Sequence, residues 1–299
     1  MSRKEPVFIG GAGRSGTTLI VDMLGLHPRL SPIYETDFVL HLMSLVVETP
    51  MRVKTLQKDV IRIMDEWTKP LPHRPHNKRE HEKFHHGAHH ILFDRPFAMD
   101  QTRRFIEEVA SGRPIAGMRA LVNKLFSEHC RLEDKPRWIN KTPDYVRQLP
   151  MLHELFPDLR FIHCIRDGRD IACSVTTRPW GPKTIPEAAA WWKDKIQSGV
   201  QFGKADPDQY LEVRYEDVVR DPAAQLRHIL AWLGEEDCSA EMLEHYQGGA
   251  VSLDESRIGD WKTRFSADDL RAFTAQAGTF LEHFGYTEAR VGCSAKEAA

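Results

Sequence analysis

The 299-residue chain is long enough for one large α/β domain or for two smaller ones. Its 41% hydrophobic and 28% charged residues are those of an ordinary globular protein and exclude a disordered or fibrous one. The formal net charge is −2, so the chain lacks the global positive field that drives nucleic-acid binding. An anionic ligand therefore has to be held by a local cluster of charges.

Cysteine usage and the N-terminal segment indicate the compartment. The five cysteines form no C-x-x-C pair, which argues against a disulfide framework and against a structural zinc site. The first residues lack the apolar core of a signal peptide, and the longest apolar run, 38–47, is too short to span a bilayer. We expect a cytoplasmic protein without a transmembrane segment.

Strand and helix patterns alternate along the chain. Short apolar runs predict strands at 7–10, 138–140, 160–166 and 210–214. Helical spacing predicts helices at 17–26, 144–156, 167–177, 186–202, 222–233 and 267–284. Alternation of this kind predicts an α/β fold in three layers, with a central parallel sheet flanked by helices. No internal repeat or strong linker divides the chain, so we expect a single domain over residues 1–299.

A glycine-rich loop joins the first strand to the first helix. Its residues Gly10-Gly-Ala-Gly-Arg-Ser-Gly-Thr-Thr18 allow a tight turn whose N–H groups converge on one anion at a helix N-terminus. Gly11 and Gly16 have P-loop spacing, so the fold is expected to be P-loop-like, but Thr17 stands where a P-loop has its lysine. The missing lysine argues against a triphosphate ligand, and Arg14 offers a guanidinium to a phosphate or sulfate instead.

After the strand at 7–10, the segment Arg14-Ser-Gly-Thr-Thr18 resembles the 5′-phosphosulfate loop of sulfotransferases that use 3′-phosphoadenosine 5′-phosphosulfate (PAPS), in the form found in tyrosylprotein sulfotransferases. The resemblance implies that the loop binds the 5′-phosphate of the donor. The residues concerned are Gly13, Arg14, Ser15, Gly16, Thr17 and Thr18.

A second cluster of charge follows the strand at 160–166. Ser174 and Arg178 lie four residues apart at the end of the helix predicted over about 167–177, so they are expected to share a face and to converge with Arg166 at the strand end. One serine and two arginines suit a dianion. In tyrosylprotein sulfotransferases a similar Arg-Asp-Gly-Arg segment binds the 3′-phosphate of PAPS; the alternative is surface charge at a helix N-terminus.

Two further segments resemble family motifs near the nucleotide. Gly259-Asp-Trp-Lys262 through Phe265 resembles the segment that closes over the nucleotide in cytosolic sulfotransferases, which makes Arg257 a candidate for the 3′-phosphate and Lys262 a candidate nucleotide ligand. The tyrosylprotein enzymes have lysine where this chain has Asp260. Tyr215 matches a family position near the nucleotide, with core packing as the alternative.

The resemblance also supplies candidate catalytic residues. Glu35 follows Arg14 by 21 residues, at or near the spacing of the catalytic glutamate in tyrosylprotein and heparan sulfotransferases, and Lys141 matches the lysine of their Asn-Lys-x-Pro segment. The implied reaction is in-line displacement at sulfur, with Glu35 as general base and with Arg14 and Lys141 stabilising charge. A helix N-terminus is the alternative role for Glu35. The implied donor is PAPS and the implied product is PAP, without an obligatory metal ion.

An insertion at about 68–132 matches no family motif and is expected on the acceptor side. Its first part, 68–100, reads as a loop with a short helix near 80–90, and it holds six histidines: His76, His81, His85, His86, His89 and His90. Three of them recur every four residues, a spacing that can chelate zinc, but no cysteine joins them. We expect no metal and a solvated or acceptor-facing segment.

Two other functions remain open. A nucleotide or small-molecule kinase with a P-loop would phosphorylate with ATP and Mg²⁺, and a non-catalytic nucleotide-binding protein would keep the fold without turnover. For the sulfotransferase the expected acceptor is a hydroxyl on a small molecule, a carbohydrate or a lipid, and nucleic acid is not an expected partner.

Overall fold

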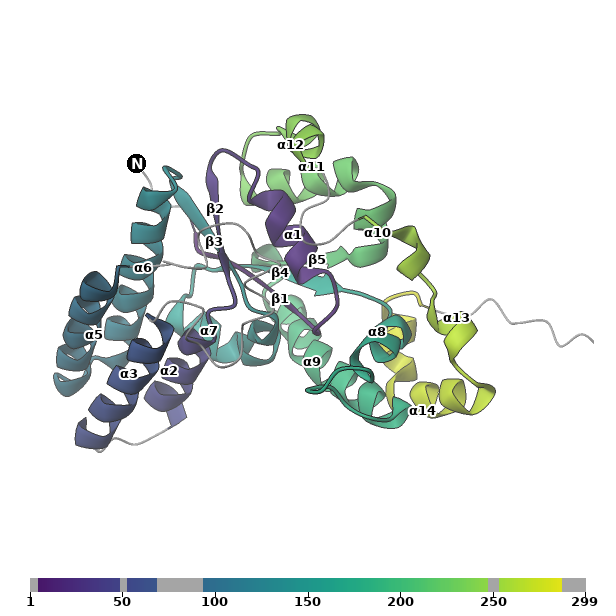
Figure 1. Cartoon of the computed structure of the whole chain (residues 1–299), viewed down its shortest axis with the longest axis horizontal. Helices are drawn as coiled ribbons and strands as arrows, with labels where there is room; N and C mark the ends of the chain where they lie inside the picture. The colour runs from purple at the N-terminus through teal and green to yellow at the C-terminus, as the bar shows by residue number, and fades with distance from the viewer. Residues whose placement is uncertain (1–4, 49–52, 69–93, 247–252, 287–299) are drawn as a thin grey trace, which may run out of the picture. The chain divides into compact units, whose positions relative to one another are not determined.

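The computed structural model describes residues 5–48, 53–68, 94–246 and 253–286, which form two compact units (Figure 1). The first unit holds the described residues up to Arg166 and those of 195–255. The second holds residues 167–194 and those from 256 onward. The predicted histidine cluster at 76–90 and the C-terminal tail lie outside the described residues.

The first unit contains a sheet of five parallel strands. The strands are β1 (Val7–Gly11), β2 (Leu30–Tyr34), β3 (Arg137–Lys141), β4 (Arg160–Ile165) and β5 (Tyr210–Arg214). Their order is β2-β3-β1-β4-β5, so β1 lies at the centre, and it is buried along its whole length as expected for a strand covered on both faces. The predicted α/β fold with a central parallel sheet is confirmed, although the edge strand β2 was not predicted.

Helices precede and follow these strands. In the first unit they are α1 (Thr17–Leu24), α2 (Asp37–Glu48), α3 (Val53–Trp67), α5 (Arg95–Ala110), α6 (Pro114–Leu132), η3 (Pro143–Gln148), α7 (Leu149–Leu155), η4 (Pro207–Gln209), α10 (Tyr215–Arg220), α11 (Pro222–Leu233) and α12 (Ser239–His245). Helix α9 (Ile185–Ala205) has residues in both units. The predicted helix at 144–156 is a 3₁₀ turn followed by α7, with Pro150 in the first turn of α7.

The C-terminal part of the predicted insertion is a pair of helices. Helices α5 and α6 pack against each other, and α3 lies against α5 (Figure 1). Phe126 of α6 packs edge-to-face on Trp138 of β3 with 5.0 Å between ring centroids, and Phe105 of α5 belongs to the same core. Residues 95–132 therefore contribute to the hydrophobic core of the first unit, and the predicted loop at 68–100 was wrong for residues 95–100, which begin α5.

The second unit is small and helical. It contains α8 (Gly168–Val175), η5 (Glu255–Arg257), α13 (Trp261–Arg264) and α14 (Ala267–His283), with the last two residues of η5 on its side of the boundary. Trp192 is fully buried against Phe273 and Phe284, while its neighbour Trp191 is half-buried.

Across the residues that the structure describes, no helix has both the length and the apolar character that crossing a bilayer requires.

Candidate active site at the carboxyl ends of the strands

All five strands of the sheet end at a candidate functional residue. Parallel strands present their carboxyl ends at one edge of a sheet, which is where ligands bind in open α/β folds. The residues at that edge are the glycine-rich loop after β1, Glu35 after β2, Lys141 at the end of β3, Arg166 after β4 and Tyr215 after β5. Glu35 and Tyr215 follow the two edge strands, β2 and β5, and are 180 positions apart in the sequence. The parallel sheet therefore brings residues that are distant in sequence to one edge.

The glycine-rich loop has the backbone expected of an anion site. Gly16, at φ 92°, precedes α1, which has no side-chain cap on its first turn. The first N–H groups of a helix lack intrahelical partners, so this end of α1 suits an anion. The Ser15 hydroxyl is buried and finds no hydrogen-bond partner within the described structure. An orphaned buried hydroxyl inside the loop fits a phosphate oxygen as its missing partner.

Arg166 and Tyr215 lie against this loop. The Arg166 Nη1 donates to the carbonyl oxygen of Arg14 at 3.2 Å, and its guanidinium lies 4.4 Å from the centroid of the Tyr215 ring. The ring also covers Gly16 so closely that a Cβ at this position would meet Tyr215 Cδ2 at 2.8 Å. Stacking on the ring fixes the plane of the guanidinium beside the loop.

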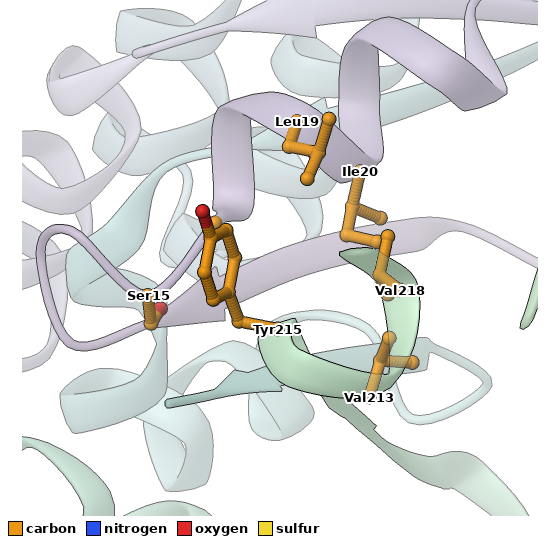
Figure 2. A pocket seen from close by; sticks show the side chains of 7 residues that line it. Ser15, Leu19, Ile20, Val213, Tyr215 and Val218 are labelled. Carbon is orange, nitrogen blue, oxygen red and sulfur yellow. The ribbon is translucent and has the colours of Figure 1, made fainter. Parts of the chain in front are cut away.

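A small pocket adjoins the loop. Figure 2 shows Tyr215 beside Ser15, while branched side chains from α1, β5 and α10 form the apolar part of the lining. The lining residues are Ser15, Gly16, Leu19, Ile20, Val213, Tyr215 and Val218. Tyr215 therefore packs in the core of the first unit and also borders the loop, while its contact with a nucleotide stays a prediction.

Glu35 and Lys141 form an ion pair at the ends of β2 and β3. Lys141 is completely buried, and its ammonium contacts Oε1 of Glu35, whose side chain is 32% exposed. The amide of Glu35 donates to the carbonyl oxygen of Lys141 at 2.6 Å, and the ring of Tyr34 lies 5.7 Å from Lys141 Nζ. A buried ammonium costs free energy unless it is paired, so Lys141 depends on this carboxylate or on another anion.

The remaining predicted ligands lie in the second unit. Ser174 is on α8, Arg257 ends η5, and Lys262 is on α13. Helix α8 ends at Val175, two residues earlier than predicted, so the argument that Ser174 and Arg178 share a helix face was wrong. Arg178 follows the helix in a turn, where the Arg178 amide donates to the Val175 carbonyl oxygen at 2.9 Å.

Asp170 has a role that the sequence did not reveal. Its two carboxylate oxygens accept from the amides of Gly259 at 2.8 Å and Trp261 at 3.0 Å. Its neighbour Arg169 lies 3.8 Å from the centroid of the Trp261 ring and pairs with Asp167. These contacts tie the Gly-Asp-Trp-Lys segment to the start of α8. An aspartate in the first turn of a helix is explained by its interaction with the helix dipole. The sequence therefore provided no reason to expect a contact between Asp170 and the Gly-Asp-Trp-Lys segment.

Among the described residues, no group of three or more histidine, cysteine, aspartate or glutamate side chains is placed to hold a metal ion.

A model of the sulfotransferase family matches residues 6–238, more than half of the chain, and the chain therefore belongs to the sulfotransferase family. The family predicted from the motifs is confirmed.

Individual relatives agree with this family. Protein-tyrosine sulfotransferase A of Caenorhabditis elegans is 26% identical over 239 residues, which are 78% of this chain and 50% of the relative. The omega-hydroxy-beta-dihydromenaquinone-9 sulfotransferase of Mycobacterium bovis is 25% identical over 305 residues, 94% of this chain and 75% of the relative. The chain spans about half to two thirds of the length of several curated relatives.

The fold has a solved counterpart. The sulfotransferase domain of the olefin synthase from Synechococcus PCC 7002 superposes with a TM-score of 0.56 at 22% identity, over 96% of this chain and 98% of that domain. The predicted P-loop-like fold is confirmed.

Proposed function

We propose that the protein transfers a sulfuryl group from PAPS to an acceptor hydroxyl and releases PAP. The observation that carries the proposal is the single edge of the sheet, where the loop of α1, Arg166 and the Glu35–Lys141 pair lie on neighbouring strands. Because the chain belongs to the sulfotransferase family, sulfuryl transfer is the reaction proposed for this arrangement.

The donor is assigned to two anion sites. The loop from Gly13 to Thr18 holds the 5′-phosphate with its N–H groups and hydroxyls, and the buried Ser15 hydroxyl supports this assignment. The 3′-phosphate is assigned, from the resemblance of their sequence motifs to the family alone, to Arg166, Ser174, Arg178 and Arg257. Tyr215 and Lys262 are assigned to the rest of the nucleotide, and the contact between the Tyr215 ring and Gly16 supports the former.

Three side chains carry out the transfer. Glu35 accepts the proton of the acceptor hydroxyl while the oxygen of that hydroxyl attacks sulfur. Lys141 stabilises the negative charge on the bridging oxygen as the sulfur–oxygen bond to the phosphate breaks, and Arg14 stabilises the sulfuryl oxygens. The burial of Lys141 supports its role, because an ammonium shielded from water interacts more strongly with a developing charge. No bridging Mg²⁺ is required, since a sulfuryl group carries less charge than a phosphoryl group.

The acceptor is proposed to be a hydroxyl on a small molecule, a carbohydrate or a lipid. The two relatives are named for a protein tyrosine and for an omega-hydroxylated dihydromenaquinone, and each of these compounds carries a hydroxyl. A cytoplasmic location is proposed as well. The thiols of Cys130, Cys164, Cys173 and Cys238, which form no disulfide in the part of the chain described, support a reducing compartment.

Calorimetric titration with PAP tests the donor site, with ATP plus Mg²⁺ titrated in parallel. We expect PAP to bind and the Arg166→Ala variant to weaken that binding at least tenfold, because a charge-assisted contact to phosphate contributes about 1.5–3 kcal/mol. Arg160→Ala is the matched control, since Arg160 begins the same strand and lies at its opposite end.

A parallel assay measures transfer from radiolabelled PAPS to naphthol, dodecanol and N-acetylglucosamine. Binding of ATP with Mg²⁺ and no response to PAP would replace this proposal with the kinase. Tight PAP binding without transfer to any hydroxyl would favour the non-catalytic nucleotide-binding protein.

A further inference from the structure

The proposed base lies in an unfavourable backbone conformation. Glu35 has a φ of 47°, in the left-handed region that favours glycine, and among the described residues only Arg14 and Asp134 share this property without being glycine. Strained residues of this kind persist where the surrounding structure determines them, and they gather at functional sites. The contacts of Glu35 and its neighbours show what holds this conformation.

The chain is fixed on both sides of Glu35. Before it, Tyr34 lies opposite Lys141 in the β2–β3 register, and the Glu35 amide donates to the Lys141 carbonyl oxygen. After it, the Thr36 amide donates to Oγ1 of Thr142 at 3.0 Å, and the Thr36 hydroxyl donates to Oδ1 of Asn140 at 2.9 Å. Residues 34 and 36 are therefore both tied to the end of β3.

The partners of Thr36 are themselves held in place. The Tyr145 hydroxyl donates to Asn140 Oδ1 at 2.5 Å and lies 3.0 Å from the Thr36 hydroxyl, while Asn140 Nδ2 donates to the Ile33 carbonyl oxygen at 3.1 Å. Burial raises the pKa of the Tyr145 phenol, which keeps it protonated and able to donate. We call Thr36, Asn140, Thr142 and Tyr145 the hydroxyl clamp; all four are at most 1% exposed.

The clamp and the ion pair use alternate residues of one segment. Successive residues of an extended chain point to opposite sides, so Asn140 and Thr142 face Thr36 while Lys141 between them faces Glu35. The end of β3 and the residue after it therefore hold two things. The charge of Lys141 holds the Glu35 carboxylate, and hydrogen bonds hold the next residue, Thr36.

We infer that the hydroxyl clamp consists of positioning residues that hold Glu35 in its left-handed conformation and aim its carboxylate at Lys141. None of the clamp contacts described above reaches the Glu35 side chain, so the clamp acts through the backbone. The inference rests on the proposed function for its kinetic part, because Glu35 has to act as the base for the clamp to affect turnover.

Thr36→Val removes the central hydroxyl and keeps the size of the side chain. We expect kcat for transfer from PAPS to fall at least tenfold, because small displacements of a reacting group reduce rates steeply, while the Kd for PAP changes less than twofold. Thr36→Ser restores the hydroxyl and is expected to recover most of the lost activity. Thr102→Val is the matched control, since Thr102 is equally buried and donates to the Ala98 carbonyl oxygen of α5 at 2.7 Å.

A crystal structure of Thr36→Val provides a readout without turnover. We expect Glu35 to leave the left-handed region or to lose its contact with Lys141. Retention of both features would overturn the inference, and so would a kcat reduced no more than in Thr102→Val. If Thr36→Val fails to fold, Tyr145→Phe removes one clamp hydroxyl and is expected to show the same changes to a smaller degree.

The two proposals fail in different ways. A wild-type protein that neither binds PAP nor sulfates a hydroxyl would refute the proposed function, while the structure of the variant would still decide whether the clamp holds Glu35.

Discussion

The loop after β1 and the corner after β2 both need a left-handed residue, and they obtain it differently. In the loop, Arg14 also has a positive φ, of 74°, but the residue immediately before α1 is Gly16, with a φ of 92°. At the corner, Glu35 takes a φ of 47°, although an L-residue in this region costs about 1–2 kcal/mol. Glycine suffices at position 16 because the anion site proposed there uses the backbone.

The difference shows what a side chain in a strained backbone conformation requires of its surroundings. A glycine at position 35 would relieve the strain but would carry no carboxylate, so the corner keeps the glutamate and holds it by contacts from β3 and Tyr145. A backbone site can be built from local sequence, whereas a strained side-chain site needs partners from elsewhere in the chain.

The largest expected effect comes from removing the chemistry of the corner while keeping its shape. Glu35→Gln retains an oxygen that can accept from Lys141 but cannot take a proton. We expect kcat to fall by a factor of about 10²–10⁴, the usual contribution of a general base, with the Kd for PAP unchanged within about twofold. Glu107→Gln on the exposed face of α5 is the control. Undiminished turnover with normal PAP binding would remove Glu35 from the mechanism.

A second substitution breaks the loop. Gly16→Ala combines a positive φ with a Cβ that meets the Tyr215 ring at 2.8 Å, whereas Gly234→Ala, at φ 65°, meets nothing within 4 Å. Urea unfolding should therefore show a loss of about 1 kcal/mol for Gly234→Ala and a further 1–3 kcal/mol for Gly16→Ala. Calorimetry should show weakened PAP binding for Gly16→Ala alone. Equal losses in the two variants would mean that the contact with Tyr215 does not constrain the loop.

The smallest expected effect isolates the strain at the corner. Glu35→Gly and Glu35→Ala both remove the base and leave Lys141 without its carboxylate, but only glycine relieves the positive φ. We expect Glu35→Gly to be more stable than Glu35→Ala by about 1 kcal/mol in urea unfolding, with both variants inactive. A glycine variant no more stable than the alanine variant would show that the backbone at position 35 is unstrained.

The contrast between loop and corner also explains which features the sequence revealed. The loop is local, so its glycines, its arginine and its place between strand and helix are readable from nine consecutive residues. The clamp is not local: Thr36 is 104 residues from Asn140 and 109 from Tyr145. No spacing rule connects such residues, and Glu35 itself was identified only through the family resemblance.

Strand β2 and helices α5 and α6 are among the parts of the fold that escaped prediction, each for a different physical reason. Strand β2 is a five-residue edge strand with Ser31 and Pro32 inside it, and proline and serine obscure the apolar pattern of a strand. Helices α5 and α6 follow a segment rich in proline, histidine and basic residues, whose composition suggested a loop. Their apolar residues, such as Phe105 and Phe126, reach the core only once the chain has folded.

The order of the strands restrains the loop after β1 and the corner after β2 unequally. Strand β1 is bonded on both sides, to β3 and β4, whereas β2 is bonded to β3 alone. An edge strand can tilt or lengthen with the adjustment of a single ladder, while a central strand has to carry two neighbours with it. The corner that carries the proposed base can therefore shift with one neighbouring strand, while the loop proposed to hold the donor can shift only together with two.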